Sequence, residues 1–145
     1  MKKRTFEFNK EIIFGELGAL ISVPTVSFLV SLFTKNPSAI STAAVIASLI
    51  GASAFWIFMR VFDEKRRKSY TFQHFATEVG YFTPVAFIIA VLVYYPSLFF
   101  ISKYFLTKER VVYAVITAQA VAFTLFVILM NFYRHMLFKL TGEEL

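Results

Sequence analysis

The sequence contains no cysteine, which excludes disulfide bonds, thiolate metal ligands and thiol redox chemistry. Charged residues are also scarce, because Asp, Glu, Lys and Arg make up 17% of the chain whereas hydrophobic residues make up 58%. A soluble domain needs a larger polar fraction to cover its surface. Water is therefore not the main solvent of this protein.

Histidine is rare as well. His74 and His135 lie far apart in the sequence and have no neighbours at metal-ligand spacing. The sequence also has no glycine-rich phosphate loop, no zinc-binding helix motif and no pattern of serine, histidine and acid. We therefore expect no enzymatic activity, no metal site and no cofactor.

Four apolar runs fill most of the chain, and each can cross a hydrocarbon core about 30 Å thick at 1.5 Å rise per residue. They lie at about 12–33, 39–62, 75–101 and 111–133. The runs predict an all-α integral membrane bundle of four transmembrane helices in one domain. Its parts are a hairpin at about 12–62, a connector at 63–74, a second hairpin at about 75–133 and a tail at 134–145.

The basic residues predict the orientation of this bundle. Eleven of the 15 lie before the first run, near the middle connector or in the tail, and four lie near the other two loops. Because cytoplasmic loops carry the excess of Lys and Arg, we expect both termini in the cytoplasm of a cell (inner) membrane. The net charge of +6 therefore serves contact with membrane lipid, and we expect no nucleic-acid partner. The same assignment places Tyr94 and Tyr95 near the outer interface.

The two predicted hairpins resemble each other. Glu16 and Gly18, followed by Pro24, correspond to Glu78 and Gly80, followed by Pro84. Since each half has an even number of spans, the halves would form a parallel repeat about an axis along the membrane normal. The repeat predicts equivalent depths for Glu16 and Glu78.

These two glutamates are the candidates for proton coupling. A carboxylate inside a span is costly unless it is paired, protonated or exposed to water, and a group that changes protonation suits a proton carrier. The alternative is a structural anion, because both residues are expected near helix N-termini, where the macrodipole stabilises negative charge.

Four further residues are candidates for binding a substrate. Gln119 lies about eight residues into the last span, where its amide needs a partner. Interhelical hydrogen bonding is the alternative role. Pro24 and Pro84 each free a backbone carbonyl, although prolines are also simple kinks in membrane helices. Thr83 precedes the second of these prolines.

Two other groups of residues have weaker predicted roles. Arg60, Arg66 and Arg67 near the middle connector are candidates for binding lipid headgroups or phosphate. Small residues four apart predict close helix packing, within one chain or between the subunits of a homo-oligomer. They are Ala43, Ala47 and Gly51 in the second span and Ala114, Ala118 and Ala122 in the fourth.

Taken together, the pattern resembles the small four-span L-alanine exporter family of bacterial inner membranes. The resemblance rests on the early acids Glu16 and Glu78 and on three motifs. These are Ala54-Phe55-Trp56-Ile57-Phe58-Met59-Arg60, Tyr81-Phe82-Thr83-Pro84-Val85, and Tyr113-Ala114-Val115-Ile116-Thr117-Ala118-Gln119 leading to Leu137-Phe138-Lys139-Leu140-Thr141. It implies proton-driven export of a small neutral amino acid. Glutamates stand where that family usually has aspartates.

A second resemblance is to the GtrA-like family, through the repeated hairpin and the Asn131-Phe132-Tyr133-Arg134 ending. It implies flipping of polyprenyl-phosphate sugars, or help in that step. Three classes thus remain: an exporter of a small solute, a flippase or its helper, and a non-transporting assembly subunit. An exporter needs a protonatable group that a cavity reaches, a flippase needs a lateral opening with cations for phosphate, and an assembly subunit needs no cavity.

Overall fold

The computed structural model describes residues 2–66 and 83–141. The long elements are α1 (Lys2–Phe33), α2 (Pro37–Arg66), α4 (Tyr95–Phe105) and α5 (Val111–Thr141). Residues 83–89 are also helical, and they continue through the π-helix η1 (Ala90–Tyr94) into α4. Four helical stretches are long and apolar enough to cross a membrane: Ile12–Phe33, Pro37–Met59, Thr83–Phe105 and Val111–Leu140. The described part of the chain is therefore all-helical, and the protein is a multi-pass membrane protein, as the apolar runs predict.

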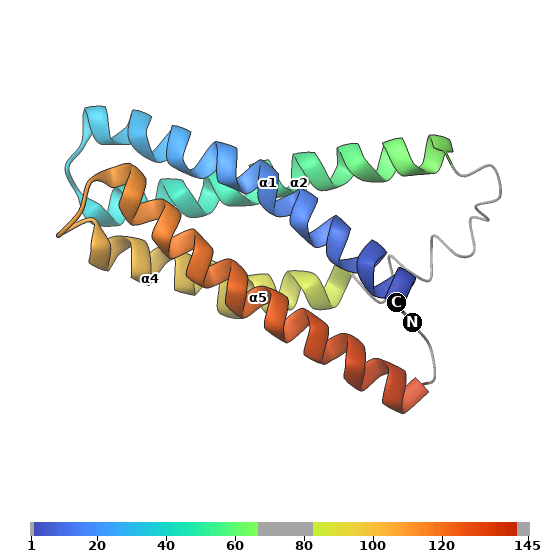
Figure 1. Cartoon of the computed structure of the whole chain (residues 1–145). Helices are drawn as coiled ribbons and strands as arrows, with labels where there is room; N and C mark the ends of the chain where they lie inside the picture. Colours follow the sequence, from blue (N-terminus) through green and yellow to red (C-terminus); the bar gives the residue numbers. More distant parts are fainter. Residues whose placement is uncertain (1, 67–82, 142–145) are drawn as a thin grey trace.

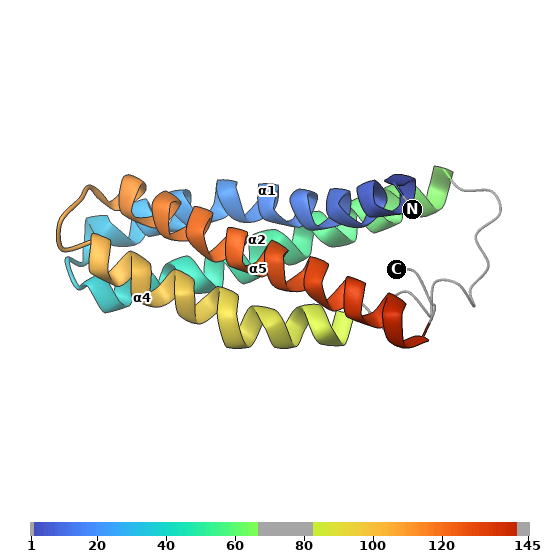
Figure 2. The same cartoon turned by 60° about the horizontal axis from the view of Figure 1, so that its bottom comes forward.

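The helices form a bundle in which each long helix runs opposite to the next (Figure 1). The connection between α1 and α2 and the connection between α4 and α5 lie at one end of the bundle, and α1 begins and α5 ends at the other (Figure 2). We call these the loop end and the open end. The predicted start of the third span, at residue 75, lies outside the described residues.

The turn at residues 34–36 follows directly from its sequence. The side chain of Asn36 accepts a hydrogen bond from the backbone N–H of Ser38 at 3.0 Å, which is the N-cap interaction expected of asparagine. Pro37 occupies the first position of α2, where its missing N–H costs nothing. Lys35 donates to the carbonyl of Ser31 at 3.3 Å and so satisfies a group at the end of α1.

Glycine brings α1 and α2 unusually close. A Cβ atom on Gly18 would collide with the backbone carbonyl of Gly51, and one on Gly51 would collide with Gly18 and the hydroxyl of Ser22. That hydroxyl donates to the carbonyl of Ala47 at 2.7 Å. The two helices therefore meet backbone to backbone, as small residues allow in membranes.

The predicted small-residue faces lie at helix contacts inside this chain. Buried members are Ala47, Gly51, Ala114, Ala118 and Ala122, and Ala43 is half-buried. Ala47 packs in a core with Ala19, Val23, Ala44 and Val115, and Ala118 and Ala122 pack with Leu98. These faces thus join helices of one chain.

Candidate functional site

Glu16 lies deep in its helix rather than at a helix end. Because α1 begins at Lys2, about four helical turns precede Glu16. The macrodipole acts mainly within the first turn, so it does not account for an acid at this position. The side chain is 8% exposed. The expectation of a helix-end anion is therefore wrong for Glu16, because the helix extends well before the apolar run.

The carboxyl group of Glu16 is held by side chains from two other helical segments. The hydroxyl of Tyr94 lies 3.1 Å from Oε2 and 3.3 Å from Oε1, and Nε2 of Gln119 donates to Oε1 at 2.8 Å. Gln119 is fully buried in α5. Both partners are neutral, so these contacts satisfy hydrogen bonds without supplying a counter-charge.

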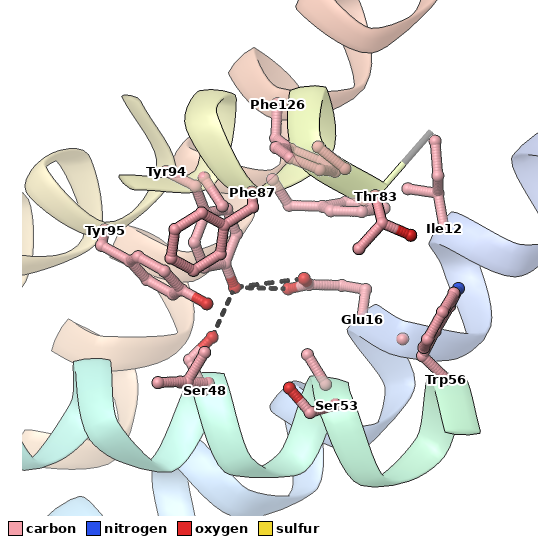
Figure 3. A pocket seen from close by; sticks show the side chains of 16 residues that line it. Ile12, Glu16, Ser48, Ser53, Trp56, Thr83, Phe87, Tyr94, Tyr95 and Phe126 are labelled. Carbon is pink, nitrogen blue, oxygen red and sulfur yellow. Dashed lines mark hydrogen bonds between the residues drawn. The ribbon is translucent and has the colours of Figure 1, made fainter. Parts of the chain in front are cut away.

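A third helix extends the cluster through Tyr94. The hydroxyl of Ser48, on α2, donates to the hydroxyl of Tyr94 at 3.0 Å, which leaves the Tyr94 proton for Glu16 (Figure 3). By helix rise, Ser48 lies roughly 16 Å from the start of α2 and Tyr94 roughly 16 Å from the end of α4. These depths are about half of a 30 Å hydrocarbon core. Ser48 and Tyr94 therefore lie near the middle of their spans, Pro37–Met59 and Thr83–Phe105.

An irregular backbone turn carries Tyr94. The N–H of Tyr95 donates to the carbonyl of Ala90, five residues earlier, which defines a π-turn. Pro96 follows at once. In a regular helix its ring would press against the carbonyl of Leu92 and its missing N–H would leave that carbonyl free. The widened turn lies where this conflict occurs, and π-turns within helices are frequent at functional sites.

Beside the cluster lies an open, mainly apolar cavity of about 210 Å³. Its walls come from α1, α2, the stretch 83–95 and α5, and they include Glu16, Ser48 and Tyr94. Glu16 points into this space, as Figure 3 shows. The lining residues on α1 and α2, from Ile12 to Glu16 and from Ser48 to Trp56, lie on the open-end side of the bundle.

The other sequence candidates differ in where they lie. Thr83 lines the cavity. Pro24 lies within α1, which continues unbroken to Phe33, and neither Pro24 nor Pro84 is among the lining residues. Oε1 of Gln119 is buried without a hydrogen-bond partner in the described part of the chain.

Several candidates fall outside what the structure describes. Glu78 and Arg67 lie in the segment 67–82. Arg60 and Arg66 belong to α2, but their side chains are outside the described set. The pairing of Glu16 with Glu78, and the predicted headgroup contacts of these arginines, therefore stay predictions.

Sequence reasoning missed the roles of Tyr94 and Ser48. The expectation of Tyr94 at the outer interface is wrong, because Tyr94 is 5% exposed and bonds to Glu16. The predicted third span, at about 75–101, placed Tyr94 toward its outer end. In the structure the helix continues to Phe105. Pro96, two residues after a tyrosine inside the span, was the available signal of an irregular turn there.

No family model matches the chain, and neither does any curated protein or any solved structure. The fold and the site still define a class. This is a multi-pass helical membrane protein with a buried glutamate that has neutral hydrogen-bond partners, in the wall of a small cavity.

Proposed function

We propose that this protein is a small proton-coupled transporter that exports a small solute, with Glu16 as the group that carries the proton. One observation supports this above all others: the carboxyl of Glu16 lies in the wall of a cavity, among neutral partners, within a helix long and apolar enough to cross a membrane. A fixed charge there is costly. A proton bound to Glu16, or a cation bound beside it in the cavity, offsets that cost. Binding of the proton and binding of the cation are therefore linked.

The partners of Glu16 suit both of its protonation states. An ionised carboxylate accepts hydrogen bonds from the Tyr94 hydroxyl and the Gln119 amide nitrogen. A protonated carboxyl donates one, and the acceptors are the Tyr94 oxygen and Oε1 of Gln119, which has no partner among the described residues. The network can therefore gain and lose a proton with small movements of side chains.

The cavity favours the exporter over the other two classes. At about 210 Å³ it is below the roughly 300–1,000 Å³ of pockets for drug-sized ligands, so a small solute fits better than a sugar on a lipid phosphate. A phosphate would also be repelled by the charge of Glu16. An assembly subunit has no use for a buried carboxyl group in the wall of such a cavity.

The finer features of the proposal come from the sequence. The resemblance to L-alanine exporters makes alanine the first solute to test, and the predicted parallel repeat would make Glu78 the counterpart of Glu16. The distribution of basic residues favours an inner membrane with both termini in the cytoplasm, so that the open end faces the cytoplasm. Since the chain has no cysteine, single introduced cysteines report the orientation directly. A cysteine at position Asn36 should be labelled by a reagent added outside the cell. Labelling of a cysteine at Ser69 from outside would contradict the orientation.

Transport in proteoliposomes tests the coupling. Wild-type protein should move labelled alanine against its gradient when a proton gradient is imposed. Glu16→Gln keeps the shape and part of the hydrogen bonding but carries no proton, so gradient-driven transport should fall at least about tenfold. Exchange of labelled alanine without a proton gradient should persist.

Glu109→Gln is the matched control, because Glu109 is an exposed acid in the loop between α4 and α5. It should transport as the wild type does. Glu78→Gln in the same assay tests the proposed counterpart. If Glu16→Gln and the double variant keep the wild-type rate and pH dependence, Glu16 has no part in coupling.

A further inference from the structure

Aromatic side chains surround the space into which Glu16 points. Six of the residues lining the cavity carry rings: Trp56, Phe87, Tyr94, Tyr95, Phe123 and Phe126. They come from α2, from the stretch 83–95 and from α5, so rings face the space from several sides (Figure 3). A ring face attracts a cation, and cages of such rings are the common binding site for ammonium groups.

Part of this cage is fixed by contacts between the rings themselves. Tyr94 meets Tyr95 edge to face, with ring centroids 5.4 Å apart, and meets Phe126 in the same manner at 5.9 Å. The hydroxyl of Tyr94 is held at the same time by Ser48 and Glu16. The rings next to the carboxylate are therefore preorganised, which lowers the cost of ordering them around a ligand.

The charges of the cavity select the type of ligand. Among its described lining residues, Glu16 is the single charged side chain and none is basic. An ammonium group finds both a counter-charge and aromatic faces there. The carboxylate of an amino acid finds no cation, and it would lie near Glu16, a charge of its own sign.

We propose that this cavity binds a small organic ammonium cation that has no carboxylate, and that this cation takes the place of the proton on Glu16. The inference rests on the proposed function in that both use the same cavity, but it makes the solute a carboxylate-free amine instead of an amino acid. Aromatic rings and the carboxylate recognise the ammonium group together.

Exchange at one carboxylate also balances charge. When the cation binds, the protonated Glu16 releases one proton, and the cavity keeps the same net charge before and after. Among the described residues, the titratable groups that face Glu16 are the hydroxyl of Tyr94, bonded to it, and that of Tyr95 in the same wall. Gln119 and Ser48 are neutral members of the network. One monovalent cation leaving for one proton entering is electroneutral.

A matched pair of ligands tests the inference on the full-length protein in lipid nanodiscs by titration calorimetry. L-alanine methyl ester and L-alanine share the same amino group, and the ester lacks the carboxylate charge. The ester should bind at least about tenfold more tightly, because it avoids a buried unpaired charge. Tetramethylammonium should bind as well, and titrations in buffers of different ionisation enthalpy should show release of one proton per cation at a pH where Glu16 is protonated.

Two variants separate the role of the rings from general effects. Phe87 lines the cavity and is 59% exposed, and Phe100 lies in the same span, outside the lining, at 66% exposed. Phe87→Leu should weaken tetramethylammonium binding about fivefold by loss of a cation–π contact. Phe100→Leu should leave it unchanged. Glu16→Gln should weaken binding roughly a hundredfold or more.

The outcomes distinguish this inference from the transport proposal. If L-alanine binds as tightly as its ester, or tetramethylammonium does not bind to the wild type, the ammonium inference is overturned while proton-coupled alanine export can still stand. Equal losses in Phe87→Leu and Phe100→Leu would overturn the role of the aromatic cage. If the amines bind with release of a proton but no gradient-driven transport occurs, the inference stands and the transporter proposal fails. Should Glu16→Gln not fold, proton release by the wild type still decides the matter.

Discussion

The two ends of the bundle are filled by different kinds of side chain. Toward the loop end, the buried residues are mostly small or medium in size, among them Ala19, Val23, Ala44 and Val115. Toward the open end, the cavity is lined by large rings such as Trp56 and Phe126. Small residues let helices approach until no space is left, whereas bulky rings hold them apart and leave gaps between their edges.

The two ends of the bundle therefore differ in access to Glu16: the open end has a cavity and the loop end is closed by packing. The Glu16 cluster lies at the boundary, with the cavity on one side and close packing on the other. An exporter that works by alternating access must at some stage close the first side and open the second. In the proposed exporter, the packing of the loop end is therefore what must open, and substitutions there test this.

Truncating Leu98 should have the largest effect on the packing that distinguishes the loop end from the open end. Leu98 is fully buried one turn beyond Tyr94 and packs with Ala118 and Ala122. Leu98→Ala leaves a void that should cost ~2–5 kcal/mol of stability. The void would also extend the cavity toward the loop end, so proteoliposomes should leak protons in the absence of solute, measured with an enclosed pH dye.

Leu92→Ala provides the control for this variant. Leu92 lies in the same span but is 70% exposed, so its truncation should change stability by less than about 1 kcal/mol and cause no leak. Equal leaks from Leu98→Ala and Leu92→Ala would show that Leu98 does not seal the loop end.

The contact between Gly18 and Gly51 should give the next largest effect. Gly18→Ala places a methyl group against the backbone of Gly51, and overpacking of this kind costs ~1–3 kcal/mol. In Gly15→Ala the new atom meets the carbonyl of Ala52 at an ordinary 3.7 Å, and alanine favours the helix by roughly 0.5–1 kcal/mol. Reversible unfolding in mixed micelles should therefore show opposite signs for the two, and equal stabilities would contradict the close approach of α1 and α2.

Much of this fold could be predicted from the sequence, and the site only in part. The apolar runs indicate four spans because bilayer thickness fixes their length, and buried polarity marks Glu16 and Gln119 because such groups need partners in lipid. Their direct hydrogen bond depends on how two helices rotate, which periodicity alone does not determine. Tyr94 was harder still, since aromatic residues are common at interfaces and the π-turn that carries it breaks the regular helical period.

The smallest expected effect concerns the seam between α2 and α4 at the loop end. The hydroxyl of Ser102 donates to that of Ser41 at 2.9 Å, and both side chains are fully buried. Interhelical hydrogen bonds in membranes average about 0.6 kcal/mol and reach about 1.7 kcal/mol at most. Ser41→Ala, Ser102→Ala and the double variant should give a coupling free energy in that range when unfolding is measured in mixed micelles. Ser27→Ala is the control, because the buried Ser27 hydroxyl has no hydrogen-bond partner in the described part of the chain. Removing it should not destabilise the protein.

A weak hydrogen bond between Ser41 and Ser102 suits a seam that opens in each cycle of the proposed transport, since little free energy is lost when the helices separate. A coupling well above 2 kcal/mol would make this seam a permanent contact, and the opening of the loop end would have to occur between other helices.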